Sequence, residues 1–219
     1  MNGKRLIIFL GLFYIFLLES CNGISKKSST QIIPKDTSKS FKINGIWVTP
    51  KTSFDFNSFD GISGDTLKLV SCAEYIYSPF GIIHSKEELK TSLLKDFQVT
   101  DRNENDGSQI STVQLLKLDF NELILFFDTD REATKESYIL KGEIHDNKVK
   151  FDMGIKIGMT MGDFYKTFFD LIPKELQVKF RVVKLSSCVD AITHFYDFKN
   201  GKLESVKFGC EGCTWTLDY

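Results

Sequence analysis

The chain has 219 residues and a formal net charge of −1 at pH 7, from 28 basic and 29 acidic side chains. This balance provides no general electrostatic attraction to nucleic acid, so a nucleic-acid partner is not expected. Hydrophobic residues make up 42% of the chain and aromatic residues 13%, which excludes a wholly disordered protein and predicts a folded core.

The first 20 residues have the pattern of a signal peptide. Lys4 and Arg5 precede an uncharged apolar run from residue 6 to residue 18. This run is shorter than the about 20 residues that a membrane-spanning helix needs. We therefore predict that residues 1–20 are cleaved from the mature protein.

The end of this segment carries a second signal. Leu18, Glu19, Ser20 and Cys21 resemble the lipobox of bacterial lipoproteins. The resemblance implies cleavage before Cys21, acylation of its thiol and its new amino group, and attachment to a lipid bilayer. By the same resemblance, Asn22 favours the outer membrane. The alternative is an ordinary secretory signal cut nearby, with Cys21 left as a free or paired thiol.

Residues 21–40 differ in composition from the rest of the chain. They are rich in Ser, Thr and Lys, with no aromatic side chain. Such a segment buries too little apolar surface to offset the entropy of ordering it. We predict a flexible tether between the lipidated Cys21 and a folded part.

Two helix-start signals follow in the chain. Ser85 precedes Glu88 by three residues, and Thr160 precedes Asp163 by the same spacing. In each case the hydroxyl can cap an early backbone N–H, and the acid lies in the first turn, where the helix dipole favours it. We expect a capped helix at each place.

Each predicted helix is followed by segments rich in β-branched and aromatic residues, which predict antiparallel strands. Asn200 and Gly201 separate two of these segments and predict a two-residue type I′ hairpin. The expected fold is therefore α+β, built from two tandem units of a capped helix followed by strands. The units span residues 41–152 and 153–219.

The second unit contains the segments IKIGMTMGDFYKTF and HFYDFKNGKLESVKF. This part of the chain, residues 155–208, resembles a repeat of the β-lactamase-inhibitor-protein-like superfamily, whose shape the outer-membrane assembly lipoproteins share. The residues at matching places in its turn, helix start and final strand are Gly158, Met159, Thr160, Gly201 and Leu203. The resemblance implies protein binding or scaffolding rather than catalysis.

Four cysteines remain if Cys21 is acylated, an even number in an oxidising compartment. A two-residue hairpin loop would place Cys188 opposite Cys213 and Ala191 opposite Cys210, unless a bulge changes the register. The leading expectation is a disulfide from Cys188 to Cys213 or Cys210, with Cys72 bonded to the other.

Two local patterns could support catalysis. Cys210 and Cys213 form a CxxC pair, but no helix start follows to stabilise a thiolate. Asp128 and Asp130 end a predicted strand, where acids are more often solvated than catalytic. The three histidines lack metal-ligand spacing and are expected at caps, turns or the sheet surface. No metal or cofactor is therefore expected.

Five aromatic residues could serve as interface anchors, because exposed aromatic side chains on a sheet are common binding hot spots. The alternative for each is core packing. They are Trp47, Tyr75, Tyr77, Phe80 and Trp215.

These observations predict a lipid-anchored envelope protein whose role is protein binding or scaffolding at the periplasmic face of the outer membrane, with another envelope protein as partner. The alternative is an envelope hydrolase or thiol redox protein that uses Asp128 and Asp130 or the pair Cys210 and Cys213.

Overall fold

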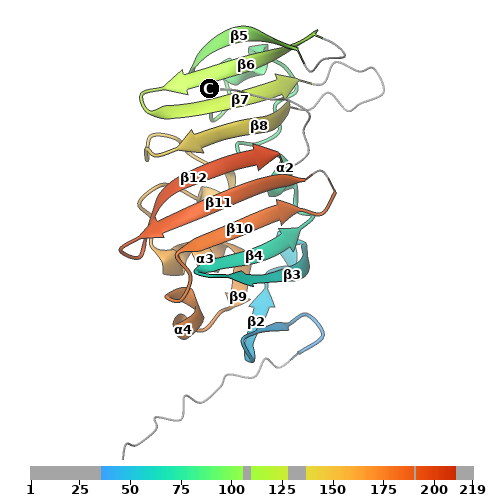
Figure 1. Ribbon diagram of the computed structural model, residues 1–219, viewed down its shortest axis with the longest axis vertical. Helices are drawn as coiled ribbons and strands as arrows, with labels where there is room; N and C mark the ends of the chain where they lie inside the picture. The colour runs from blue at the N-terminus through green and yellow to red at the C-terminus, as the bar shows by residue number, and fades with distance from the viewer. Residues whose placement is uncertain (1–35, 106–109, 128–136, 190, 211–219) are drawn as a thin grey trace, which may run out of the picture. The chain divides into compact units, whose positions relative to one another are not determined.

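The fold is dominated by β-strands. The computed structural model describes residues 36–105, 110–127, 137–189 and 191–210 (Figure 1). Strands hold 50% of these residues and helices 16%. The largest element is a nine-stranded mixed sheet in the order β3-β4-β10-β11-β12-β8-β7-β6-β5.

Neighbouring strands of this sheet are antiparallel except for β4 and β10, which run parallel. The strands are β3 (Phe56–Ser63), β4 (Thr66–Ser71), β5 (Gln98–Asn105), β6 (Ile110–Leu118), β7 (Asn121–Phe127), β8 (Ser137–Ile144), β10 (Val182–Ser187), β11 (Ile192–Lys199) and β12 (Lys202–Cys210).

A smaller sheet and short helices complete the described elements. The sheet has the order β1-β2-β9, with β1 (Phe41–Ile43), β2 (Ile46–Pro50) and β9 (Phe169–Leu171). The helices are α2 (Glu74–Tyr77), α3 (Met161–Phe168) and α4 (Lys174–Gln177), with 3₁₀ turns η2 (Thr52–Phe54), η3 (Glu87–Lys90) and η4 (Asp152–Gly154). None of the described helices combines the length and apolar character needed to cross a membrane.

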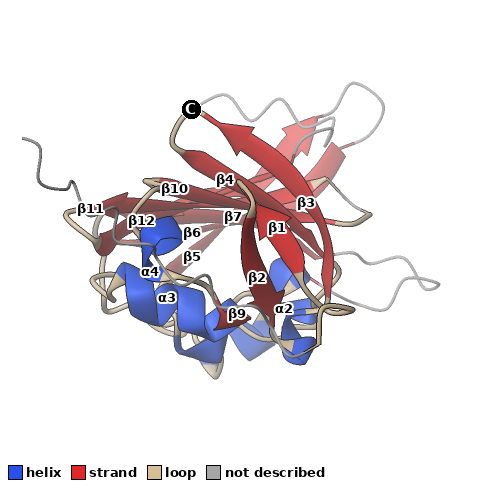
Figure 2. Cartoon of the chain, turned by 90° about the horizontal axis from the view of Figure 1, so that it is seen from below, coloured by secondary structure: helices blue, strands red, loops and turns tan. Residues whose placement is uncertain are grey.

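The helices lie together on one side of the nine-stranded sheet (Figure 2). The main core fills the space between them, and aromatic side chains form its centre. The ring of Phe164 in α3 lies 4.8 Å from that of Tyr196 and 5.1 Å from that of Phe198, both in β11. Offset and edge contacts of this kind add to the burial of apolar area.

The prediction of two tandem helix-and-sheet units is wrong. The strands before residue 152 and those after it belong to one sheet, because β4 pairs with β10 and β8 pairs with β12. Neither pairing has a local signal, since each joins segments far apart in the chain. The structure is mostly β rather than α+β with two helix-capped units.

The first of the two predicted helices does not form as an α-helix. Its segment contains only the 3₁₀ turn Glu87–Lys90. Thr91 Oγ1 donates to the backbone carbonyl oxygen of Glu88 at 3.1 Å, and Ser92 Oγ donates to that of Leu89 at 2.9 Å. Hydroxyl groups that bond nearby backbone atoms compete with helix continuation, which explains the failure of the Ser85 signal.

The second predicted helix is confirmed. Thr160 is the N-cap of α3, and its Oγ1 accepts a hydrogen bond from the backbone N–H of Asp163 at 3.1 Å. The same hydroxyl donates to Asp163 Oδ2 at 2.7 Å. These bonds lower the pKa of the Asp163 carboxyl, with the Thr160 hydrogen bond as the main cause and Lys166 as a further one.

The predicted hairpin is also confirmed. Asn200 and Gly201 have φ angles of 53° and 72°, as a type I′ turn requires, and Lys199 lies opposite Lys202. A register shift at Asp197 then moves the pairing by one residue. Cys210 consequently lies opposite Ile192 rather than Ala191.

A disulfide joins Cys72 to Cys188, with a Cα–Cα distance of 5.2 Å. The expected bonds from Cys188 to Cys210 or Cys213 are therefore wrong. Ser71 of β4 lies beside Ser187 of β10 in the parallel register, so the two following cysteines leave the sheet side by side. The prediction was wrong because it was based only on the antiparallel hairpin that follows Cys188. It did not include the parallel pairing of β10 with β4.

Candidate functional site

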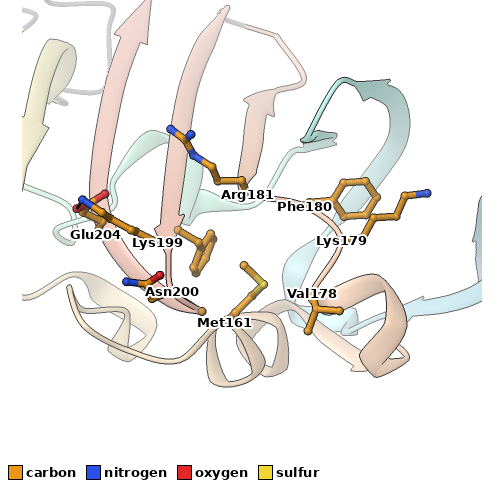
Figure 3. Close-up of a pocket in the computed structure, with 10 residues that line it drawn as sticks. Met161, Val178, Lys179, Phe180, Arg181, Lys199, Asn200 and Glu204 are labelled. Carbon is orange, nitrogen blue, oxygen red and sulfur yellow. Dashed lines mark hydrogen bonds and ion pairs between the residues drawn. The ribbon is translucent and has the colours of Figure 1, made fainter.

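A pocket of 490 Å³ lies where three segments meet: the start of α3, the loop from α4 to β10, and the β11–β12 hairpin (Figure 3). Lys199, Asn200 and Glu204 line it from the hairpin. Val178, Lys179, Phe180 and Arg181 line it from the loop, and Met161 from the helix.

Backbone hydrogen bonds hold the hairpin against the start of α3. Gly158 N–H donates to the carbonyl oxygen of Leu203 at 2.8 Å, and Leu203 N–H donates to that of Met159 at 2.9 Å. Met161 N–H donates to the carbonyl oxygen of Gly201 at 2.9 Å. The turn before α3 and the strand after Asn200 thus form one connected unit, which fixes one side of the pocket.

The pocket has an apolar floor. Phe180 is 1% exposed, Phe198 is 2% exposed and Met161 is 9% exposed. Val178 at the edge is 79% exposed and adds an apolar side chain to the rim. An apolar group from a ligand or partner could extend this floor without displacing any charge.

The rim of the pocket is mainly cationic. Arg181 pairs with Asp197, with distances of 3.3 Å from Nε to Oδ1 and 3.4 Å from Nη2 to Oδ2. The hydrogen bond to Asp197 raises the pKa of the Arg181 guanidinium. Lys199 Nζ lies 3.0 Å from Glu204 Oε1. Lys179 extends away from the other charges and makes no ion pair with a described carboxylate (Figure 3).

The chemistry of this lining suits binding better than group transfer. The described lining contains no Ser, Thr, Cys or His that could act as a nucleophile or proton carrier. Its single carboxylate, Glu204, is held by Lys199. Within the part of the chain that the structure describes, no three His, Cys, Asp or Glu side chains are grouped for a metal ion.

The four predicted aromatic anchors that the structure describes are not among the residues that line this pocket. Tyr75 and Phe80 are 4% and 3% exposed and belong to the main core, so neither presents a surface to a partner. Tyr77 is partly buried, with its hydroxyl 3.6 Å from Cys188 Sγ. Trp47 is also partly buried, and Lys42 Nζ lies 4.7 Å from its ring centroid.

Several other predicted residues lie outside the described ranges, so the structure does not bear on their roles. They are Cys21, Asp128, Asp130, Cys213 and Trp215. Cys210 is described and is disulfide-bonded.

Sequence reasoning missed the charged residues of the pocket and misplaced one histidine. Arg181 and Glu204 had no local sequence signal, because they approach the pocket from segments that only tertiary structure brings together.

His194 was expected at a cap, turn or surface, but it is 0% exposed, with Nδ1 3.1 Å from the Tyr196 hydroxyl. The Tyr196 hydroxyl in turn lies 2.8 Å from that of Tyr75. The apolar neighbours Ile192 and Phe198 were the available sign of this burial.

Comparisons with protein-family models, with curated proteins and with solved structures found no match for this chain. The case for a function therefore rests on the residues of the chain and on the geometry described above.

Proposed function

We propose that this chain is a lipid-anchored envelope protein that binds a partner protein, as a scaffolding module at the periplasmic face of the outer membrane. The observation that carries the binding role is the pocket beside the β11–β12 hairpin, with its apolar floor and mainly cationic rim. The partner segment that fits this chemistry is extended, acidic and carries an apolar side chain.

The apolar floor and the rim would act together on such a segment. An apolar side chain of the partner would extend the buried surface formed by Phe180 and Phe198, next to the exposed Val178. Carboxylates of the partner would be attracted by Lys179 and by the outer faces of Arg181 and Lys199. Complementary charge at a rim contributes mainly to association rate and specificity.

The resemblance to the β-lactamase-inhibitor-protein-like superfamily supports the same role. The residues that carry it belong to two stretches, around Gly158 and around Gly201. Three backbone hydrogen bonds join these stretches beside the pocket. The two stretches of the pattern thus lie together in this chain, and the resemblance favours protein binding over catalysis by analogy.

The membrane anchor rests on the signal-like residues 1–20 and on Cys21. A tether of about 20 residues has a root-mean-square reach of roughly 25 Å, which would let the folded part contact partners near the bilayer surface. We expect intact-mass analysis of protein extracted from host membranes to show loss of residues 1–20 and added acyl chains. A Cys21→Ala form should lack the acyl mass and leave the membrane fraction, and an unacylated native protein would contradict the anchor.

The pocket can be tested with a photo-crosslinking residue at position 178 in the native host. We expect adducts with one envelope protein, and we expect the added change Lys179→Glu to reduce their yield about tenfold by reversing one attraction at the rim. The matched control places the crosslinker at Val189, which is 77% exposed, with Lys90→Glu as the added change. Equal yields from both positions, or no effect of Lys179→Glu, would argue against this binding site.

A further inference from the structure

A second pocket, of 390 Å³, lies beside the first strand of the small sheet. Three short segments line it: residues 38–41, which lead into β1, residues 50–52, which lead from β2 into η2, and residues 55–57, which lead from η2 into β3. Small-molecule sites commonly have volumes of ~300 to 1,000 Å³, so this pocket can hold a small ligand. It shares no lining residue with the pocket beside the β11–β12 hairpin, so its ligand is independent of the partner proposed above.

Two stacked phenyl rings form the apolar wall of this pocket. The rings of Phe41 and Phe56 are nearly parallel, with an interplanar angle of 6° and centroids 4.4 Å apart. Both side chains are partly buried, and the ring of Phe56 lies 6.4 Å from that of Phe54, which is 1% exposed. The pair is therefore held against the main core. The C–H bonds on one face of a sugar ring can pack on such a wall, since the face of an aromatic ring carries partial negative charge.

Asp55 lines the same pocket, and hydrogen bonds fix its backbone. Its carbonyl oxygen accepts from Cys72 N–H at 3.1 Å and from Ser71 Oγ at 3.2 Å. Its φ angle is 45°, a left-handed conformation that aspartate tolerates better than most residues with a side chain. The side chain is exposed and forms no ion pair with any described Lys, Arg or His. Its two carboxylate oxygens can therefore accept hydrogen bonds from hydroxyl groups of a ligand.

Lys39 and Lys51 also line the pocket, so its lining carries two positive charges and one negative charge. Within the described residues, neither lysine forms an ion pair. Hydrogen bonds from Ser38 lower the pKa of the Asp36 carboxyl, and Lys39 makes a smaller contribution. That carboxylate is already bonded to the backbone and hydroxyl of Ser38. The surplus of positive charge in the lining therefore favours an anionic ligand.

We infer that this pocket binds a saccharide ring that carries a carboxylate group. One face of the ring would pack on Phe41 and Phe56, and Asp55 would accept hydrogen bonds from its hydroxyl groups. The ligand carboxylate would pair with Lys39 and Lys51, and charge-assisted hydrogen bonds of this kind are stronger than neutral ones. A simple anion would leave the aromatic wall uncovered, and a neutral sugar would leave both ammonium groups unpaired.

Saturation-transfer NMR with the full-length protein in detergent tests this site. The probes are D-glucuronate, D-glucose, which lacks the carboxylate, and acetate, which lacks the ring. We expect transfer from the protein to the ring protons of glucuronate. Its dissociation constant should be about tenfold lower than that of glucose, because a charge-assisted pair is gained. Acetate should bind at least about tenfold more weakly than glucuronate, because it cannot cover the aromatic wall.

Substitutions in the pocket separate the roles of the charges. The double change Lys39→Gln and Lys51→Gln should weaken glucuronate binding about tenfold, to the level of glucose. Asp55→Asn keeps a side chain that tolerates a positive φ angle. It should weaken glucuronate binding about threefold, because the lost charged acceptor outweighs the screened repulsion that the change relieves. The matched controls Lys42→Gln in β1 and Asp60→Asn in β3, at exposed side chains outside the pocket lining, should bind glucuronate as the parent does.

Circular dichroism establishes that each variant is folded. If the double lysine variant unfolds, Lys39→Gln alone, at an exposed side chain, is expected to weaken glucuronate binding about threefold. The inference is overturned by transfer to glucuronate no greater than from detergent alone, or by equal affinities for glucuronate and glucose. Acetate binding as tight as that of glucuronate would show a site for simple anions only and overturns it too, as does glucuronate binding that the pocket variants leave unchanged.

Discussion

Replacing both Cys72 and Cys188 by alanine is expected to lower the free energy of unfolding by about 4 to 5 kcal/mol. The bond joins residues 116 apart in the sequence, so it removes a large loop-closure entropy from the unfolded chain. It also links the ends of β4 and β10, the parallel pair that joins β3 and β4 to the rest of the nine-stranded sheet. Both cysteines are only partly buried, so alanine adds little cavity cost.

Urea unfolding of the oxidised protein, followed by circular dichroism, measures this effect. The urea midpoint of the double variant should be lower than that of the parent. Adding reductant should lower the midpoint of the parent much more than that of the variant, which retains only the disulfide of Cys210. A difference under about 1 kcal/mol would contradict the expectation that the bond restricts the unfolded chain.

Acidification is expected to destabilise the protein through His194. Burial lowers the pKa of its imidazole from 6.5 to about 3, and a backbone contact with Ile76 opposes this shift only in part. Its ring packs against Phe208 at 4.8 Å and leaves no room for a hydrated cation. The folded state therefore holds His194 neutral over the pH range in which the unfolded chain binds a proton.

The direction of the effect follows from proton linkage. The contribution of His194 to stability is fully present above pH 6.5 and is lost progressively as the pH falls toward 3. In that window the loss approaches about 1.4 kcal/mol per pH unit, so we expect a cost of about 2 to 3 kcal/mol between pH 6.5 and 4.5.

Urea midpoints measured across this range separate His194 from the carboxylates. His194→Gln, which does not titrate, should unfold with a shallower dependence on pH than the parent. His145→Gln makes the same change of side chain at a partly exposed position and is the matched control for replacing an imidazole by an amide. Parallel curves for the parent and His194→Gln would show that His194 does not contribute to acid sensitivity.

Predictions from the sequence succeeded where the signal and its effect lie within a few residues. Thr160 caps α3 through the backbone of Asp163, three residues away. Asn200 and Gly201 form the hairpin turn because both can adopt positive φ angles. Neither feature requires knowledge of a distant segment.

The failures share a different cause. Ser85 begins no α-helix because the hydroxyl groups of Thr91 and Ser92 bond backbone carbonyl oxygens three residues earlier. Cys188 was predicted to form its disulfide with Cys210 or Cys213. In the structure, β4 lies beside β10, and the disulfide forms with Cys72. The charged residues of the pocket were missed because each is ordinary in its local sequence.

The sequence by itself determined the signal-like start, the folded core, the cap of α3 and the turn at Asn200, because each depends on composition or on contacts within one turn of the chain. Tertiary structure alone decided the single nine-stranded sheet, the bond from Cys72 to Cys188 and the pocket beside the hairpin. The physical reason is that a strand edge can pair with any compatible edge, so the free energy of the whole sheet selects among pairings that local patterns leave equivalent.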